Sequence, residues 1–325
     1  MYMKKGFKKL AVGSAVLAGA AALASAVSYF VTKNLLTVAL DRKEPKAIGK
    51  SKEILTGNPN IEETAKLQKK IAERLENEPL EDVEIVADDG TKLIGHFHRA
   101  QNAKRTIIAM HGWRSSFSKD FGMIADFWFE NDCNVLFAEQ RGQGKSGGEY
   151  MGFGLVERFD TLCWIDWVNS RIDNSLPIYL AGISMGATTV LMASGEKLSP
   201  NVKGVMADCG FTSPEAIWKH VAKNMHLRYN ELMGYWASNI CKRKINFGAN
   251  DYSTIEAMKN TDIPVLFVHG TEDKFVPIEM TYENYVACVS PKRLLVVPGA
   301  QHGMSYFTEK ANYEKAIKDF WKDFD

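Results

Sequence analysis

Cysteine is scarce in this chain of 325 residues, and its placement excludes two kinds of scaffold. Disulfide frameworks and structural zinc sites both need cysteines in pairs at short or regular spacings. The cysteines here are odd in number, lie far apart and include no Cys-x-x-Cys pair: Cys133, Cys163, Cys209, Cys241 and Cys288. The sequence therefore predicts neither a disulfide-stabilised scaffold nor a zinc site, and it argues against an oxidising compartment.

An excess of charge is also absent. Lysine and arginine number 40 and aspartate and glutamate number 39, for a formal net charge of +1. A nearly neutral chain has no overall field that would attract nucleic acid or an acidic polymer, so we expect no nucleic-acid partner. Hydrophobic residues make up 46% of the chain, which is enough to fill the core of a large domain.

One long stretch without charge lies near the N-terminus, from Leu10 to Val31, after a lysine-rich start. As a helix it would span about 33 Å, which is enough to cross a hydrocarbon core of about 30 Å. We therefore interpret residues 1–40 as an N-terminal membrane anchor or signal segment. The favoured interpretation is a retained single-helix anchor with the rest of the chain outside the cytoplasm.

Two alternatives to a retained anchor stay open. The small residues Ala24, Ser25 and Ala26 fit a signal-peptidase site, so the segment could be removed and the protein secreted. The segment could also be a soluble amphipathic helix. Lysine and arginine are nearly balanced on its two sides, so the sequence leaves the membrane face undecided.

The remaining sequence predicts a charged helical spacer over residues 41–80 and one large domain over residues 81–325. The domain begins with two runs around the turn signal Asp88-Asp89-Gly90, which predict an antiparallel pair of strands. The next runs are apolar throughout and separated by helical patterns: TIIAM, NVLFAE, PIYLAG, VKGVMAD, IPVLFVHG and RLLVVPG. This alternation predicts an α/β fold with a mostly parallel, doubly wound sheet that is covered on both faces.

A segment at about residues 213–260 interrupts the alternation and is too long for an ordinary connection. It is rich in aromatic residues and methionine. We predict a short helical cap over the carboxyl edge of the sheet, with an apolar substrate pocket beneath it. The candidate pocket residues are Trp218, Met225, Tyr229, Met233 and Trp236.

The sequence GISMG carries the best candidate for a nucleophile, Ser184. It matches Gly-x-Ser-x-Gly and lies between the apolar run PIYLAG and the helical pattern ATTVLMAS. A serine at such a strand-to-helix turn sits in strained backbone, where Gly182 and Gly186 relieve the crowding. We therefore predict that Ser184 is a nucleophile and not merely a small turn residue.

A serine hydroxyl needs a base, and the base needs an orienting carboxylate. His302 and Asp273 each follow an apolar run, and the carboxyl ends of neighbouring parallel strands meet at one edge of a sheet. The sequence thus predicts a triad of Ser184, Asp273 and His302. Asp208, at the end of an earlier run, is the alternative acid, and Glu272 is a close neighbour of the first choice.

An acyl-transfer transition state also needs two backbone N–H groups that face the developing oxyanion. One should belong to Met185, directly after the nucleophile. We assign the other to Trp113, in the segment HGWRSS that follows the run TIIAM. We expect no metal site: His96 and His98 could mimic a pair of ligands, but no third ligand is evident. His220 and His226 lie in the predicted cap, and His269 is interpreted as structural.

With these motifs the chain resembles the α/β-hydrolase superfamily over about residues 80–325. HGWRSS is similar to its oxyanion-loop motif, GISMG to its nucleophile elbow, and GTEDKFVP and PGAQHG to its acid and histidine loops. EQRGQGKSGG is similar to the family's D-x-R-G-H-G-x-S loop, with Glu139 and Gln143 in place of Asp and His. ADCGFTSP and MSYFTEK have counterparts in bacterial membrane-anchored or secreted hydrolases of the serine-aminopeptidase-like and acyl-esterase branch.

The expected function is that of an esterase that forms an acyl-enzyme on Ser184, without metal or organic cofactor, acting on a small-molecule or lipid-like acyl ester. An amidase or aminopeptidase with the same triad is the alternative within enzymes. A catalytically silent binding protein on the same fold is the alternative outside them.

Overall fold

The computed structural model describes residues 2–43, 61–172 and 175–325. Its described residues form an eight-stranded sheet in the order β1-β2-β4-β3-β5-β6-β7-β8. The strands are β1 (Glu81–Val86), β2 (Lys92–His98), β3 (Arg105–Met110), β4 (Cys133–Ala138), β5 (Ile178–Ile183), β6 (Val202–Asp208), β7 (Val265–Gly270) and β8 (Lys292–Val297). Strand β2 is antiparallel to β1 and β4, and all other pairs are parallel. The predicted α/β fold with a mostly parallel sheet is therefore confirmed.

Helices cover both faces of this sheet. One face carries α6 (Glu157–Arg171), α7 (Met185–Ala193), α10 (Thr254–Asn260) and α11 (Ile278–Ala287). The other carries α3 (Ile61–Glu76), α4 (Phe117–Phe121), α5 (Ala125–Glu130), α12 (Ser305–Thr308) and α13 (Lys310–Phe324). Successive residues of a strand serve opposite faces: in β3, Ile108 joins the first core and Ile107 the second. A strand that is buried on both faces needs apolar residues at nearly every position, which explains the apolar runs in the sequence.

A third apolar core lies at the carboxyl end of the sheet. It is built from α8 (Pro214–Asn224), α9 (Glu231–Ile245) and the last turns of α1 (Tyr2–Leu40). The predicted cap segment also contains α10, which packs into the core of the first face through Ala257 and Met258. The helices at the carboxyl edge are therefore α8 and α9.

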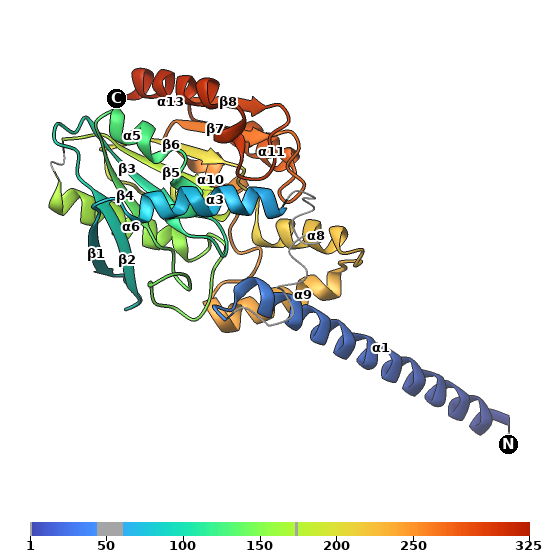
Figure 1. Cartoon of the computed structure of the whole chain (residues 1–325). Coiled ribbons are helices and arrows are strands. Elements are labelled where there is room, and N and C mark those ends of the chain that lie inside the picture. The colour runs from blue at the N-terminus through green and yellow to red at the C-terminus, as the bar shows by residue number, and fades with distance from the viewer. Residues whose placement is uncertain (1, 44–60, 173–174) are drawn as a thin grey trace.

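Helix α1 extends well beyond the domain, with the N-terminus at its far end and its last turns beside α9 (Figure 1). The side chains of Leu23, Val27 and Phe30 are exposed along it. By length and composition, Gly19–Leu40 can cross a membrane, although a signal sequence near an N-terminus has the same properties. The apolar helix predicted from the sequence is thus present in the structure.

Helix α3 packs on the domain. Leu75 is fully buried, and the Arg74 guanidinium donates to an Asp126 carboxylate oxygen and to the Gly122 carbonyl. These contacts fix the second half of the segment that we predicted as a spacer. Its first part, residues 44–60, lies outside the described residues.

Candidate active site

Ser184 occupies a sharp turn between β5 and α7. Its φ of 56° and ψ of −117° lie in a region that residues with a side chain rarely adopt. The turn is held by a hydrogen bond from the Ser184 N–H to the Asp208 carbonyl at 2.9 Å. The turn places the hydroxyl at the carboxyl edge of the sheet, directly before the N-terminus of α7.

The two glycines of the motif are required by close backbone approach. A Cβ on Gly182 would lie 2.3 Å from the Gly186 carbonyl oxygen, and a Cβ on Gly186 would lie 1.7 Å from the Met110 carbonyl oxygen. Neither position has room for a side chain. The spacing of glycines around Ser184 therefore reflects the geometry of the elbow.

His302 bridges the serine and the aspartate. Its Nε2 lies 2.9 Å from Ser184 Oγ, and its Nδ1 lies 2.7 Å from Asp273 Oδ2. Because an ionised carboxylate only accepts, Nδ1 must carry the hydrogen, so in the neutral ring Nε2 is free to accept the serine proton. The structure brings together the three residues that the sequence predicted as a triad.

Asp273 is buried and receives several hydrogen bonds. Its Oδ1 accepts from the backbone N–H groups of Phe275 and Val276, each at 2.9 Å. Its Oδ2 lies 3.2 Å from His269 Nε2 as well as near His302. Burial raises the pKa of the Asp273 carboxyl, but the charge of His302 and these bonds outweigh burial, and the net pKa lies well below its usual value. The group stays ionised over the whole working range of pH.

Asp208, the alternative acid, has another role. Its Oδ1 accepts from Ser305 Oγ at 3.0 Å, and its main-chain carbonyl holds the Ser184 N–H. Burial raises the pKa of the Asp208 carboxyl to about 6. Glu272 is exposed. The geometry therefore selects Asp273 as the partner of His302.

The predicted oxyanion loop lies directly against the nucleophile. A Cβ on Gly112 would be 3.3 Å from Ser184 Cβ, so this loop approaches the serine closely. The Gly112 N–H is taken by Asp120 Oδ2 at 2.6 Å, which fixes the loop and leaves the next N–H, that of Trp113, as the candidate donor. Met185 is the first residue of α7, so its N–H has no acceptor within the helix.

A cavity of about 240 Å³ adjoins Ser184. Three of the predicted pocket residues, Trp218, Met225 and Tyr229, line it, but Met233 and Trp236 do not. Trp236 faces α1, where its ring lies 5.0 Å from that of Tyr29. Met233 is buried one turn before Ala237, the residue of α9 that does line the cavity. The other lining residues are Thr32, Leu35, Leu36, Val38, Ala39, Trp113, Phe153, Phe211, Ile217, Val221, Ala222 and Phe275.

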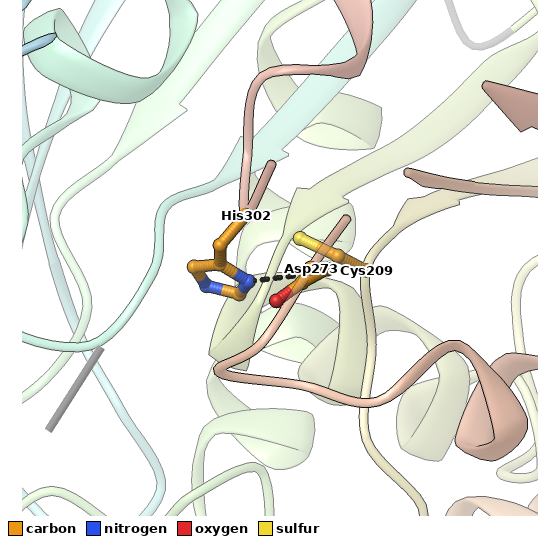
Figure 2. A group of neighbouring side chains, drawn as sticks. All are labelled: Cys209, Asp273 and His302. Carbon is orange, nitrogen blue, oxygen red and sulfur yellow. Dashed lines mark hydrogen bonds and ion pairs between the residues drawn. The ribbon is translucent and has the colours of Figure 1, made fainter. Parts of the chain in front are cut away.

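Cys209 is a neighbour of the site that the sequence analysis did not identify. Figure 2 shows it beside Asp273 and His302, and potential ligand atoms of the three residues lie within 4.8 Å of one another. A metal would need the thiolate, but burial raises the pKa of the Cys209 thiol to about 11. A metal would also compete with the hydrogen bond between His302 and Asp273. The residues present fit a hydrogen-bonded triad better than a metal site.

Three further histidines have structural partners. His98 stacks on Phe129, and His220 Nε2 lies 3.0 Å from the Lys274 carbonyl oxygen. His269 is fully buried, with Nδ1 2.6 Å from Thr281 Oγ1. Neither His220 nor His226 lines the cavity. The structural role interpreted for His269 includes a contact with the candidate triad, because its Nε2 also lies close to Asp273.

His96 lies between two carboxylates, with Nδ1 2.7 Å from Asp82 Oδ1 and Nε2 2.9 Å from Glu139 Oε1. Because both carboxylates accept, both ring nitrogens must donate, which requires the charged ring. Burial lowers the pKa of His96, but the hydrogen bonds to Glu139 and Asp82 outweigh burial and raise it above its usual value of 6.5. Glu139, which stands in place of the Asp of the family's loop motif, thus pairs with His96 of β2.

This raised pKa predicts how stability depends on pH. The stabilisation by charged His96 is fully present below the unfolded pKa of about 6.5 and is lost as pH rises through the higher folded pKa. Loss of the hydrogen bonds between the charged ring and the two carboxylates should lower the free energy of unfolding by about 2 kcal/mol. We therefore expect His96→Gln to lower Tm at pH 6 by about 4 °C. The difference from the wild type should shrink by pH 9. A difference that grows with pH, measured by thermal unfolding of both proteins, would contradict the assignment.

Comparisons with known proteins find relatives of this chain. A family model described as serine aminopeptidase, S33 (Hydrolase_4), matches residues 101–249. YqkD of Bacillus subtilis is 25% identical over 236 residues, which cover 71% of this chain and 75% of YqkD. YfhR of Escherichia coli K12 is 28% identical over 249 residues, which cover 74% of this chain and 80% of YfhR.

Solved structures support the fold. An esterase of Pyrococcus furiosus superposes with a TM-score of 0.62 at 21% identity, over 75% of this chain and 91% of the esterase. Strand order, strained elbow and family match lead to one conclusion. The chain has the α/β-hydrolase fold, and the family match over residues 101–249 supports a hydrolase of the α/β-hydrolase superfamily.

Proposed function

We propose that the chain is a serine hydrolase that cleaves carboxylic esters through an acyl-enzyme on Ser184. The observation that carries the proposal is the hydrogen-bond chain from Ser184 Oγ through His302 to Asp273 beside an apolar cavity. A hydrolase fold alone would not assign the chemistry, since one fold hosts many reactions. The proposal follows from the placement of these three side chains.

The reaction follows from their roles. Ser184 Oγ attacks the ester carbonyl carbon while its proton passes to His302 Nε2. The negative charge on the former carbonyl oxygen faces the N–H groups of Met185 and Trp113, at the positive end of the α7 dipole. The bond to the alcohol then breaks, and the alcohol leaves with the proton from His302. Water attacks the acyl-enzyme, again giving its proton to His302, and the acid leaves as Ser184 regains that proton.

An amidase or aminopeptidase is the second candidate, favoured by the description of the matched family model. An aminopeptidase needs a negative group to bind the substrate's ammonium. Among the described residues that line the cavity, none is Asp or Glu. This lining favours a substrate with an uncharged acyl group over one with a free ammonium group, so we favour ester hydrolysis over aminopeptidase activity. Matched p-nitrophenyl esters and p-nitroanilides of one acyl group distinguish ester from amide hydrolysis.

Covalent labelling tests the proposal. The full chain, solubilised in a non-ionic detergent, is treated with a fluorophosphonate probe and the adduct is located by peptide mass. We expect modification of Ser184 in the wild type and loss of labelling in His302→Ala, because the serine is activated only by its base. Folded wild-type protein that stays unlabelled would favour the catalytically silent alternative.

A further inference from the structure

Helix α1 forms one wall of the cavity beside Ser184. Its last turns contribute Thr32, Leu35, Leu36, Val38 and Ala39, opposite residues of α8 and of the loops at the carboxyl edge. Thr32 and Leu36 are almost completely buried, whereas Leu23 and Phe30, earlier on the same helix, are exposed. The helix that projects from the domain in Figure 1 therefore supplies part of the cavity wall with its last turns.

The oxyanion loop holds the end of this helix. Trp113 Nε1 donates to the Ala39 carbonyl at 2.8 Å. The Arg114 guanidinium donates to the carbonyls of Val38 at 2.9 Å and Asp41 at 2.6 Å. These carbonyls belong to the last turn of α1 and the residue after it, where a helix leaves its acceptors unused. The wall is thus tied to the loop that carries a candidate oxyanion donor.

Two further elements fix the same end. The Met151 N–H donates to the Leu40 carbonyl at 2.8 Å, and the Arg42 guanidinium donates to the Gly144 carbonyl at 2.7 Å. Asp41 forms an ion pair with Lys244 of α9. With attachments to three separate parts of the domain, the last turns of α1 have a defined position relative to Ser184.

We propose that these last turns of α1, and Leu35 above all, determine which acyl chains the enzyme accepts. The proposal rests on the proposed ester hydrolysis and names its substrate class, esters of uncharged acyl chains of medium length. A cavity of about 240 Å³ is larger than an apolar cavity of about 150 Å³ that binds a benzene ring, so it has room for a chain of several carbons. Leu35 is half-buried and lines the cavity, so its size changes the space left for the chain.

Paired substitutions at Leu35 test the proposal in the full chain, with p-nitrophenyl acetate, octanoate and laurate as substrates. Leu35→Trp narrows the cavity, and we expect its octanoate-to-acetate ratio of kcat/KM to fall about tenfold. Leu35→Ala widens it and should shift the preference to chains longer than octanoate. A general loss of structure cannot move the preference in opposite directions.

Leu23→Trp and Leu23→Ala are matched controls, since Leu23 is the same residue type on the same helix but is 67% exposed and outside the cavity. Val38→Phe is a second narrowing variant if Leu35→Trp fails to fold. Unchanged chain-length ratios in the folded Leu35 and Val38 variants, with Ser184 still labelled, would overturn the role of α1 and leave the hydrolase intact. Absence of labelling and of ester hydrolysis in the wild type would instead overturn the proposed function and the inference with it.

Discussion

Ser184→Ala is expected to lower kcat for ester hydrolysis by about a million-fold, to the level that oxyanion donors and substrate binding sustain alone. The substitution removes only the hydroxyl group, and the backbone strain at this position stays. Steady-state kinetics with p-nitrophenyl butyrate measure the loss, and the fluorophosphonate adduct should disappear with it.

Ser194→Ala is the matched control for this substitution. Ser194 is also buried, directly follows α7, and donates from Oγ to the Leu191 carbonyl, yet it lies outside the hydrogen-bond chain of the triad. We expect its kcat to stay near that of the wild type. Activity of Ser184→Ala within tenfold of the wild type would rule out the acyl-enzyme.

Asp273→Asn should give the second largest effect, a fall in kcat of about 10⁴-fold, because the amide no longer fixes the required His302 tautomer. It should also move the pH profile. Burial lowers the pKa of His302, but the Asp273 charge outweighs burial and raises it well above 6.5. Since the base must be neutral, the acid limb of kcat/KM in the wild type lies above pH 6.5, and removal of the charge should move that limb to lower pH.

Asp208→Asn separates this explanation from the alternative acid. Asp208 is buried at the same edge, but its carboxylate bonds Ser305 and not His302. We expect kcat to fall less than tenfold and the acid limb to stay near its wild-type position. The opposite result, an active Asp273→Asn and an inactive Asp208→Asn, would exchange the two aspartates.

The residues of the candidate triad could be found from sequence because each has a local signature. Ser184 lies between two glycines at a strand-to-helix turn, and Asp273 and His302 each follow an apolar run. Parallel topology then brings the three turns together without further information. The alternation of apolar runs and helical patterns gave the class of fold by the same kind of local reasoning.

The walls of the cavity could not be found in this way. A high density of aromatic residues predicts a cap but not the face that each residue occupies. The prediction that Trp236 lines the pocket is therefore wrong, since its ring packs on Tyr29. The contribution of α1 depends on contacts between residues far apart in sequence, such as Ala39 with Trp113. A long apolar helix at an N-terminus is readily explained by membrane insertion, so its sequence gives no sign that its last turns line a cavity.

The position of the cavity wall within α1 separates two properties of the polypeptide. A cut after Ala26 would remove most of the helix that could span a membrane but keep Thr32 to Ala39, and with them every residue of α1 that lines the cavity. A chain shortened to begin at Asp41 would instead lose that wall, together with the Ala39 carbonyl that Trp113 contacts and the Val38 carbonyl that Arg114 contacts. A processed and an unprocessed form would therefore share one selectivity, whereas a truncation chosen only for solubility would yield a different catalyst.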